Sequence, residues 1–142
     1  MGWENYHLYQ FRIERTDYSG PNPEWGPEEM KNAKRVRINQ VARGEKTKFI
    51  YEYDFGDGWE HEILVEKLLP QEPEVRYPVC LAGKRACPPE DCGGIGGYYY
   101  LLEVLENPTH PEHEGMLEWV GGSFDPKAFD LEQVNQRLRR IR

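Results

Sequence analysis

The sequence predicts an α+β fold: an antiparallel sheet centred on an aromatic hairpin and covered by helices from the C-terminal half. Three observations support this prediction. Residues 49–66 alternate between apolar and polar side chains around a Gly-Asp-Gly break, residues 7–14 alternate in the same way, and apolar residues recur at helical spacing after residue 98. Because the chain has 142 residues and no evident linker, we expect a single domain over residues 1–142.

The first expected strand covers residues 7–14. Its period-two face carries His7, Tyr9, Phe11 and Ile13. Residues 19–27 hold three prolines and are expected to form a loop. Residues 36–38 are then predicted to be extended, and residues 39–42 to form one helical turn.

The hairpin over residues 49–66 is the strongest local pattern. Asp and Gly at its centre tolerate the positive φ that tight turns require. One face of its first strand is almost wholly aromatic and the other carries acids, so we expect one face to be buried. Trp59 begins the second strand on the apolar face, where we expect a buried anchor.

The second half of the chain combines a long loop with helices. Residues 69–97 are rich in Pro, Gly and Cys and are expected to form an ordered loop, a type that is usually functional or held in place. Helices are expected over residues 98–106 and 111–120. A last helix has a complete start signal, because Asp130 can cap it and Gln133 occupies the reciprocal capping-box position. Its end carries four arginines: Arg137, Arg139, Arg140 and Arg142. These arginines suit either compensation of the helix dipole or a local nucleic-acid patch.

Composition excludes several classes of function. Lys and Arg total 18 and Asp and Glu total 25, a net charge of −7, which argues against duplex nucleic acid as the main partner. No apolar run approaches the roughly 20 residues that cross a membrane. The first residues resemble no secretory signal, and three cysteines are an odd number for a disulfide framework, so a cytoplasmic location is expected.

Three cysteines and two histidines form a candidate zinc site: Cys80, Cys87, Cys92, His110 and His113. Three thiolates and one imidazole complete a tetrahedral zinc site, and zinc would order a segment that has little apolar core. The spacing differs from the tight Cys-x2-Cys knuckle, however. The alternative is that the cysteines are reduced and pack as small apolar residues.

Acidic residues beside a histidine form a second candidate site at the hairpin turn. Asp54, Asp57, Glu60, His61 and Glu62 have the side chains needed for acid–base chemistry or for binding a hard cation, and Asp57, Glu60 or His61 would be used by an enzyme. The same acids also serve as turn formers and edge charges, since neighbouring strand residues point to opposite faces. For a binding function, the candidate residues are Asp57, Trp59 and His61.

Three blocks of the chain resemble the plasmid pRiA4b open-reading-frame-three-like family. They are the hairpin block Tyr53–His61, the cysteine block from Tyr77 to Tyr98, and the C-terminal block from Phe124 to Leu138. The resemblance implies a compact α+β domain that is sometimes associated with transposable elements, with no established activity.

Two departures from the family pattern affect these expectations. The pattern places a strand and a helix before the block that stands here at Met1–Leu8, so we expect a face or edge near residues 7–14 to lie open unless residues 36–38 fill it. Family members often replace the residue matching Cys92, which implies that zinc is not a requirement of the fold.

The favoured function is a non-enzymatic binding or interaction module, with a protein partner or self-association. The resemblance alone links it to plasmid or mobile-element biology. One alternative is a small, hydrolase-like, metal-dependent enzyme that uses the hairpin turn. Another is a nucleic-acid accessory protein that uses the C-terminal arginines.

Overall fold

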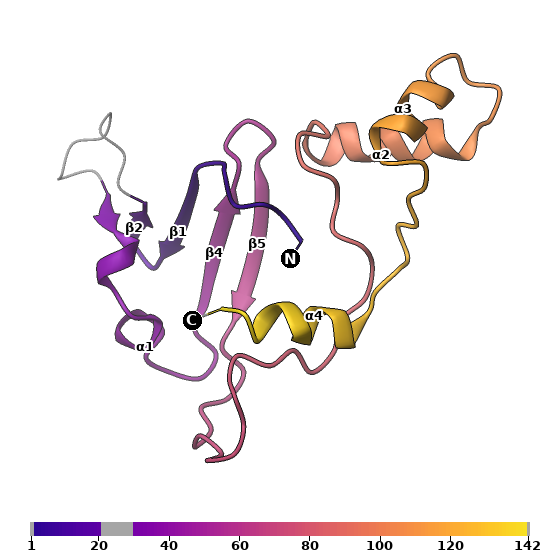
Figure 1. Cartoon of the computed structure of the whole chain (residues 1–142). Helices are drawn as coiled ribbons and strands as arrows, with labels where there is room; N and C mark the ends of the chain where they lie inside the picture. The colour runs from indigo at the N-terminus through magenta and orange to yellow at the C-terminus, as the bar shows by residue number, and fades with distance from the viewer. Residues whose placement is uncertain (1, 21–29, 142) are drawn as a thin grey trace. The chain divides into compact units, whose positions relative to one another are not determined.

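The computed structural model describes residues 2–20 and 30–141 (Figure 1). The chain divides into two compact units. The sheet unit comprises Asn5–Leu69 and Gly93–Ile95, and the helical unit comprises Met1–Glu4, Pro70–Cys92 and Gly96–Arg142. Among the described residues, no helix combines the length and the apolar character needed to cross a membrane.

The sheet unit is built on a five-stranded mixed sheet with the order β3-β2-β1-β4-β5. The strands are β1 (Tyr9–Ile13), β2 (Thr16–Ser19), β3 (Lys31–Asn32), β4 (Lys48–Tyr53) and β5 (Trp59–Leu64). All neighbours are antiparallel except β2 and β3, which are parallel. The predicted α+β class and the predicted hairpin, now β4 and β5, are therefore confirmed.

Two details of the predicted sheet are wrong. The sheet is not wholly antiparallel, and its centre is β1, because the hairpin lies at one end of the strand order. Both differences come from strands that the alternation did not predict. Residues 16–19 form the short polar strand β2, which pairs with β1 on one side and, in parallel, with β3 on the other. The predicted loop over residues 19–27 is only partly covered by the structure: Ser19 ends β2, and residues 21–27 lie outside the described residues.

Strand register places the aromatic side chains on one side of the sheet. Tyr9 lies opposite Tyr53 and Phe11 opposite Tyr51 between β1 and β4. Between β4 and β5, Tyr51 pairs with His61. We call this side the aromatic face, and its members are Tyr9, Phe11, Phe49, Tyr51, Tyr53, Trp59, His61 and Ile63.

The opposite side of the sheet is polar. The Arg12 guanidinium contacts the Glu60 carboxylate and lies 3.5 Å from a carboxylate oxygen of Glu52. The Gln10 side chain donates a hydrogen bond of 2.6 Å to Glu52. This polar face suits solvent, as expected for a sheet with one apolar side.

The core of the sheet unit lies on the aromatic face. Ile13, Ala42 and Phe49 are buried together, and Val41 packs against them. The short helix α1 (Ile38–Val41) brings Val41 and Ala42 to this core, close to the predicted helical turn at 39–42. Residues 36 and 37 have extended φ and ψ, as predicted, whereas Ile38 already begins α1. The edge of β1 that residues 36–38 were expected to fill is paired with β2.

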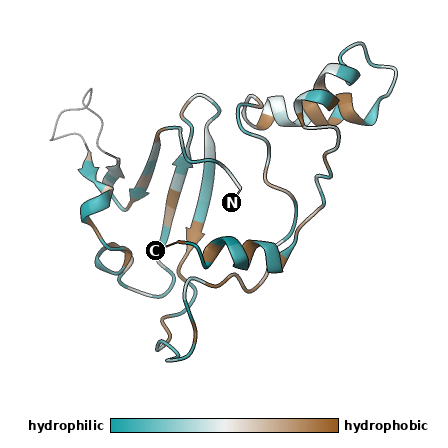
Figure 2. Ribbon diagram, viewed as in Figure 1, coloured by the Kyte–Doolittle hydropathy of each residue, from teal (hydrophilic) through white to brown (hydrophobic). Residues whose placement is uncertain are grey.

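The helical unit contains α2 (Gly94–Glu106, whose first two residues belong to the sheet unit), α3 (His113–Trp119) and α4 (Leu131–Leu138). The three predicted helices are thus present, with α2 beginning four residues earlier than expected. Leu101 and Val104 of α2 are buried. The predicted cap of α4 by Asp130 is confirmed, since its side chain accepts a 2.9 Å hydrogen bond from the Gln133 amide. Figure 2 shows polar and apolar residues mixed along α4, as an amphipathic helix requires.

Candidate binding site on the aromatic face

Two neighbouring hollows lie over the aromatic face. The larger has a volume of about 390 Å³ and is lined mainly by Asn5, Tyr9, Phe11, Lys34, Tyr51 and Ile63. The smaller has a volume of about 180 Å³ and is lined mainly by Ile13, Tyr18, Val36, Ile38, Val41 and Phe49. Phe11 and Ala33 line both hollows, so they form one groove, which we call the aromatic groove. All of these residues belong to the sheet unit.

Cross-strand ring contacts hold the floor of the larger hollow in place. The Phe11 and Tyr51 ring centroids are 4.8 Å apart, and those of Tyr9 and Tyr51 are 6.2 Å apart. The Tyr51 ring also lies 5.5 Å from the His61 ring. Such tilted aromatic pairs between neighbouring strands stabilise a sheet and fix the ring positions. The floor is therefore preorganised for an apolar ligand.

Tyr51 is the titratable group at the centre of this floor. Burial raises the pKa of its hydroxyl, and the neighbouring Tyr53 and Tyr9 raise the pKa further. The Tyr51 hydroxyl therefore stays neutral at physiological pH.

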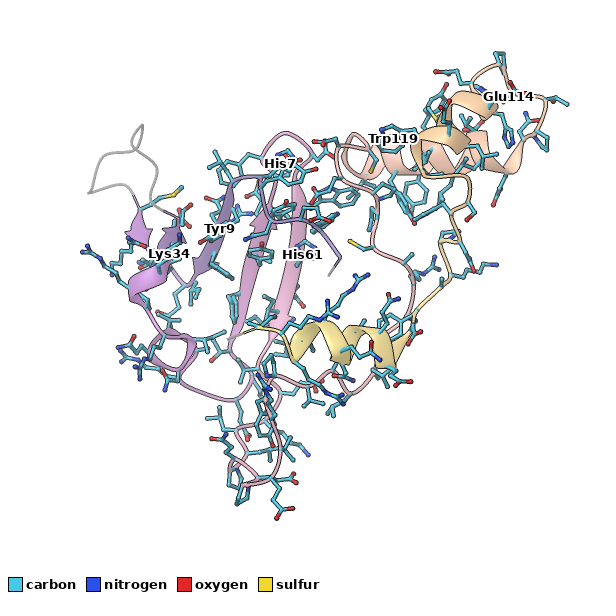
Figure 3. All side chains as sticks on the ribbon, in the orientation of Figure 1. His7, Tyr9, Lys34, His61, Glu114 and Trp119 are labelled. Carbon is cyan, nitrogen blue, oxygen red and sulfur yellow. The ribbon has the colours of Figure 1, made fainter. Side chains whose placement is uncertain are left out.

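The second wall of the groove comes from the segment after β3. The 3₁₀ helix η1 (Ala33–Arg35) begins at Asn32, whose side chain accepts a 3.0 Å hydrogen bond from the Lys34 amide. Ala33 and Lys34 then line the larger hollow across from Tyr9 and Phe11. Figure 3 labels Tyr9 of the floor and Lys34 of this wall. The site thus combines an aromatic floor with a cation.

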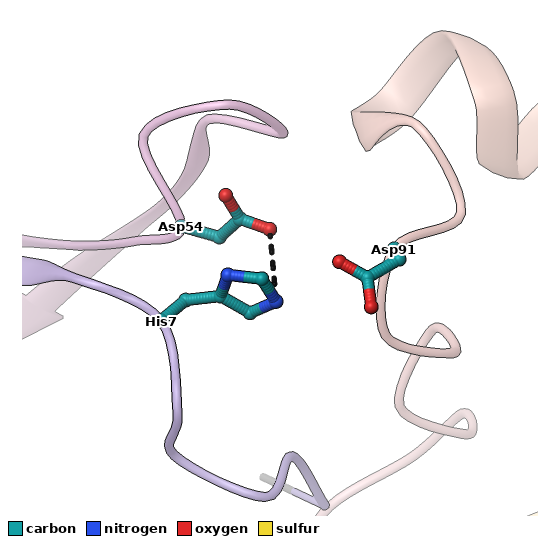
Figure 4. A group of neighbouring side chains, drawn as sticks. All are labelled: His7, Asp54 and Asp91. Carbon is teal, nitrogen blue, oxygen red and sulfur yellow. Dashed lines mark ion pairs between the residues drawn. The ribbon is translucent and has the colours of Figure 1, made fainter.

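The hairpin turn is organised by Asp54, one of the acids that were predicted to serve as turn formers. Its carboxylate accepts hydrogen bonds from the amides of Gly56 at 3.0 Å and Asp57 at 3.3 Å. Asp54 has a φ of 56°, a left-handed conformation that Asp tolerates better than most residues. Its second oxygen lies 3.6 Å from His7 Nε2 (Figure 4). The turn carboxylate therefore has a structural role.

The predicted acidic candidates at this turn are dispersed. Asp57 accepts a 3.1 Å hydrogen bond from the Gly93 amide. Glu60 lies on the polar face with Arg12, whereas His61 lies on the aromatic face with its Nδ1 3.0 Å from the Tyr51 carbonyl oxygen. The structure does not bring Asp57, Glu60 and His61 together.

Trp59 and His61, predicted for binding, both lie on the aromatic face, and His61 contacts the groove through Tyr51. Trp59 is half-buried, where full burial was expected, because it sits at the first position of β5 beside the turn. Neither side chain lines the two hollows directly.

The zinc candidates are held in the helical unit by separate contacts. The Cys80 amide and carbonyl bond to the Asn135 side chain at 2.8 and 3.0 Å. Burial raises the pKa of the Cys87 thiol. His113 Nδ1 lies 2.9 Å from the Val104 carbonyl oxygen, and His110 Nδ1 accepts a 3.1 Å hydrogen bond from the Glu112 amide.

These five side chains do not converge. Within the described part of the chain, no three of Cys80, Cys87, Cys92, His110 and His113 place ligand atoms within 4.8 Å of one another. Zinc at these residues stays a prediction, and the contacts around Cys80 and His113 indicate structural roles.

The sequence prediction missed the groove itself. Alternation placed Tyr9, Phe11 and Tyr51 on apolar faces, and a face or edge near residues 7–14 was expected to lie open, but neither prediction located a groove. The wall at Ala33 and Lys34 had no helical periodicity to reveal it. Its one signal was the density of cations that follows Lys31.

The fold and the groove define a small α+β protein with an aromatic sheet face and an arrangement suited to binding. A family model described as "Plasmid pRiA4b ORF-3-like protein" matches residues 1–133, and the chain belongs to this family. An uncharacterized protein, y4hQ, of Sinorhizobium fredii is 41% identical over 97% of this chain and 71% of its own length. The crystal structure of a protein of unknown function from Methanosarcina mazei Go1, MM3350, is similar at a TM-score of 0.79 and 35% identity, covering 94% of this chain and 75% of that chain. Neither relative has an assigned function in its name.

Proposed function

We propose that this chain is a non-enzymatic binding module that takes an apolar segment of a partner protein in the aromatic groove. The observation that carries the proposal is the larger hollow, about 390 Å³ in volume, at the junction of the central strands β1 and β4. A preformed concave site floored by aromatic rings, with a few polar groups at its margin, is the usual form of a ligand or hot-spot pocket.

The size of the groove indicates how much of the partner must be engaged. An aromatic side chain buries roughly 150–250 Å². The rings of Tyr9, Phe11 and Tyr51 are already partly buried in the fold, so a partner covers only the part of each ring that is still exposed. Association itself costs about 4–15 kcal/mol, so a partner needs contacts in both hollows to bind tightly.

The alternative functions have less support from the geometry. An enzymatic role at the hairpin turn requires Asp57, Glu60 and His61 to act together, and they point to different surroundings. A nucleic-acid role for α4 rests on Arg137 and its neighbours at the helix end, where cations compensate the helix dipole. A link to plasmid biology rests on the family name alone.

The proposal is tested with a synthetic 18-residue amphipathic helical peptide that has a leucine stripe and an uncharged Gln/Ser polar face. We expect it to shift the amide NMR signals of Tyr9, Phe11 and Tyr51 in the full ¹⁵N-labelled chain. Tyr9→Ala should weaken binding about 5–30-fold, since truncating a central aromatic contact costs about 1–2 kcal/mol.

The matched control is Leu64→Ala. Leu64 is an exposed apolar residue of β5 on the polar face, opposite Lys48 in the register, so its removal should leave binding unchanged. Signal shifts confined to the polar face, or no shifts at millimolar peptide with the fold intact by circular dichroism, would overturn the proposal.

A further inference from the structure

We infer that the aromatic groove selects an acidic amphipathic helix, an inference that rests on the proposed function and specifies its partner. The segment that lines the groove carries a basic strip, which we define as Lys31, Lys34, Arg35 and Arg37, and Lys34 of this strip lines the larger hollow. The whole chain has a net charge of −7, yet residues 31–43 contain five cations and no acid. The partner that fits this wall is negative.

The basic strip and the apolar wall come from the same segment. Ala33, Val36 and Ile38 line the hollows, and the cations alternate with them along the chain. All four cations of the strip are exposed, and within the described residues none of them forms an ion pair. Lys31 instead lies over the Tyr18 ring, 5.8 Å from its centroid. Lys34 therefore offers its charge at the margin of the larger hollow, and the other cations of the strip add positive charge on the same exposed segment.

The length of the groove matches a helix. Tyr9 in the larger hollow and Ile13 in the smaller one are four residues apart on β1, a distance of about 13 Å. Residues seven or eight apart on an α-helix are separated by about 10–12 Å along its axis and lie on one side of it. Two such apolar anchors reach both hollows, and acidic residues beside that stripe then face the basic strip.

Single-stranded nucleic acid is the competing ligand, because it also combines negative charge with groups that stack on aromatic rings. The smaller hollow argues against it, since Ile13, Val36, Ile38 and Val41 are aliphatic and give bases little to stack on. The apolar stripe of a helix uses both hollows.

The test compares three fluorescein-labelled 18-residue peptides with the same leucine stripe and with Glu, Gln or Lys at the flanking positions. Anisotropy of each peptide is measured against the full chain at 50 mM and 500 mM NaCl. Each exposed ion pair changes affinity by about 1.4–5-fold, so two or three pairs give the Glu peptide about a 5–30-fold preference over the Gln peptide. High salt should remove most of that preference.

Charge reversal identifies the groups responsible. Lys34→Glu/Arg35→Glu should reverse the order of affinity of the Glu and Lys peptides. The control Lys67→Glu/Lys84→Glu alters the net charge equally at exposed sites outside the strip and should keep the original order.

The outcomes separate the two proposals. Equal binding of all three peptides overturns the acidic preference and leaves the proposed function standing. Binding of none of them overturns both. A 15-nucleotide oligo(dT) that binds the chain more tightly than the Glu peptide and displaces it also overturns the inference, in favour of nucleic acid.

Discussion

Replacing Asp54 tests whether one carboxylate sets the hairpin turn. Asp54 is 8% exposed, holds a φ of 56°, and accepts hydrogen bonds from the amides of Gly56 and Asp57. Asp54→Ala removes the single oxygen, Oδ1, that accepts both hydrogen bonds and places an alanine in the left-handed region. Asp54→Asn keeps a side-chain oxygen and a residue that tolerates this conformation, so it is the matched control.

The expected loss follows from these contacts. A hydrogen bond to a charged group contributes about 1.5–3 kcal/mol net, and the 3.3 Å bond to Asp57 belongs at the lower end, so the two bonds contribute about 3–4 kcal/mol. The left-handed conformation adds about 1 kcal/mol for alanine. Asp54→Ala should therefore lose about 4–5 kcal/mol, and Asp54→Asn about 1–2 kcal/mol because only the charge is removed.

Urea unfolding followed by tryptophan fluorescence measures these free energies. Hydrogen exchange at the Gly58 amide, which donates a 2.6 Å hydrogen bond to the Asp54 carbonyl, reports on the turn itself. An alanine variant within about 0.5 kcal/mol of the parent, or an asparagine variant as unstable as the alanine variant, would refute the assignment of this role to the carboxylate.

Three further predictions concern α2 and the groove. Gly94→Ala should lower the melting temperature, because Gly94 has a φ of 65° and an added Cβ collides with the Asp57 carbonyl oxygen. The control Gly96→Ala lies in the same helix, its added Cβ meets no atom within 4 Å, and it should raise stability by about 0.5–1 kcal/mol. Equal melting temperatures of the two variants would contradict this prediction. Val104→Ala should cost about 2–3 kcal/mol in urea unfolding, because Val104 is fully buried and its truncation leaves a cavity, and a cost near zero would show that the site is not packed. Because the pKa of Tyr51 is raised in the folded state, its contribution to stability is present below pH 10 and is lost as the pH rises through the folded-state pKa. Tyr51→Phe should therefore flatten the decline in the free energy of unfolding above pH 10. Parallel pH profiles of the variant and the parent would contradict this prediction.

The hairpin and α4 could be predicted because their signals are local. Aromatic alternation around Gly-Asp-Gly defines β4 and β5, and the Asp130 and Gln133 pair marks the start of α4. The place of β1 at the centre of the sheet could not be predicted in this way. It depends on β2, in which Ser19 is buried and its hydroxyl donates a 2.5 Å hydrogen bond to the Tyr9 carbonyl oxygen. Such a tertiary contact cannot be predicted from the sequence of a short polar segment.

The candidate site was likewise predictable where its signals are local and not where it depends on tertiary contacts. Period-two alternation placed Tyr9, Phe11 and Tyr51 on an apolar face, but it cannot distinguish a covered face from a groove. The wall at Lys34 comes from a 3₁₀ turn, which is too short for periodicity to reveal. The backbone of Cys80 hydrogen-bonds to the side chain of Asn135, 55 residues away, a contact that the cysteine spacing could not reveal.

The central position of β1 has a consequence for the order of folding. The β1–β2 and β4–β5 hairpins have short connections and can each form within about 1–10 μs, whereas joining β1 to β4 closes a much longer loop through η1 and α1. Until that step, β1 has one unpaired edge and the rings of Tyr9 and Phe11 have no cross-strand neighbours on β4. A nascent chain that ends before Lys48 therefore exposes an unpaired edge of β1, which can pair with other chains or bind chaperones. Synthesis through Leu64 supplies the β4–β5 hairpin that pairs with this edge.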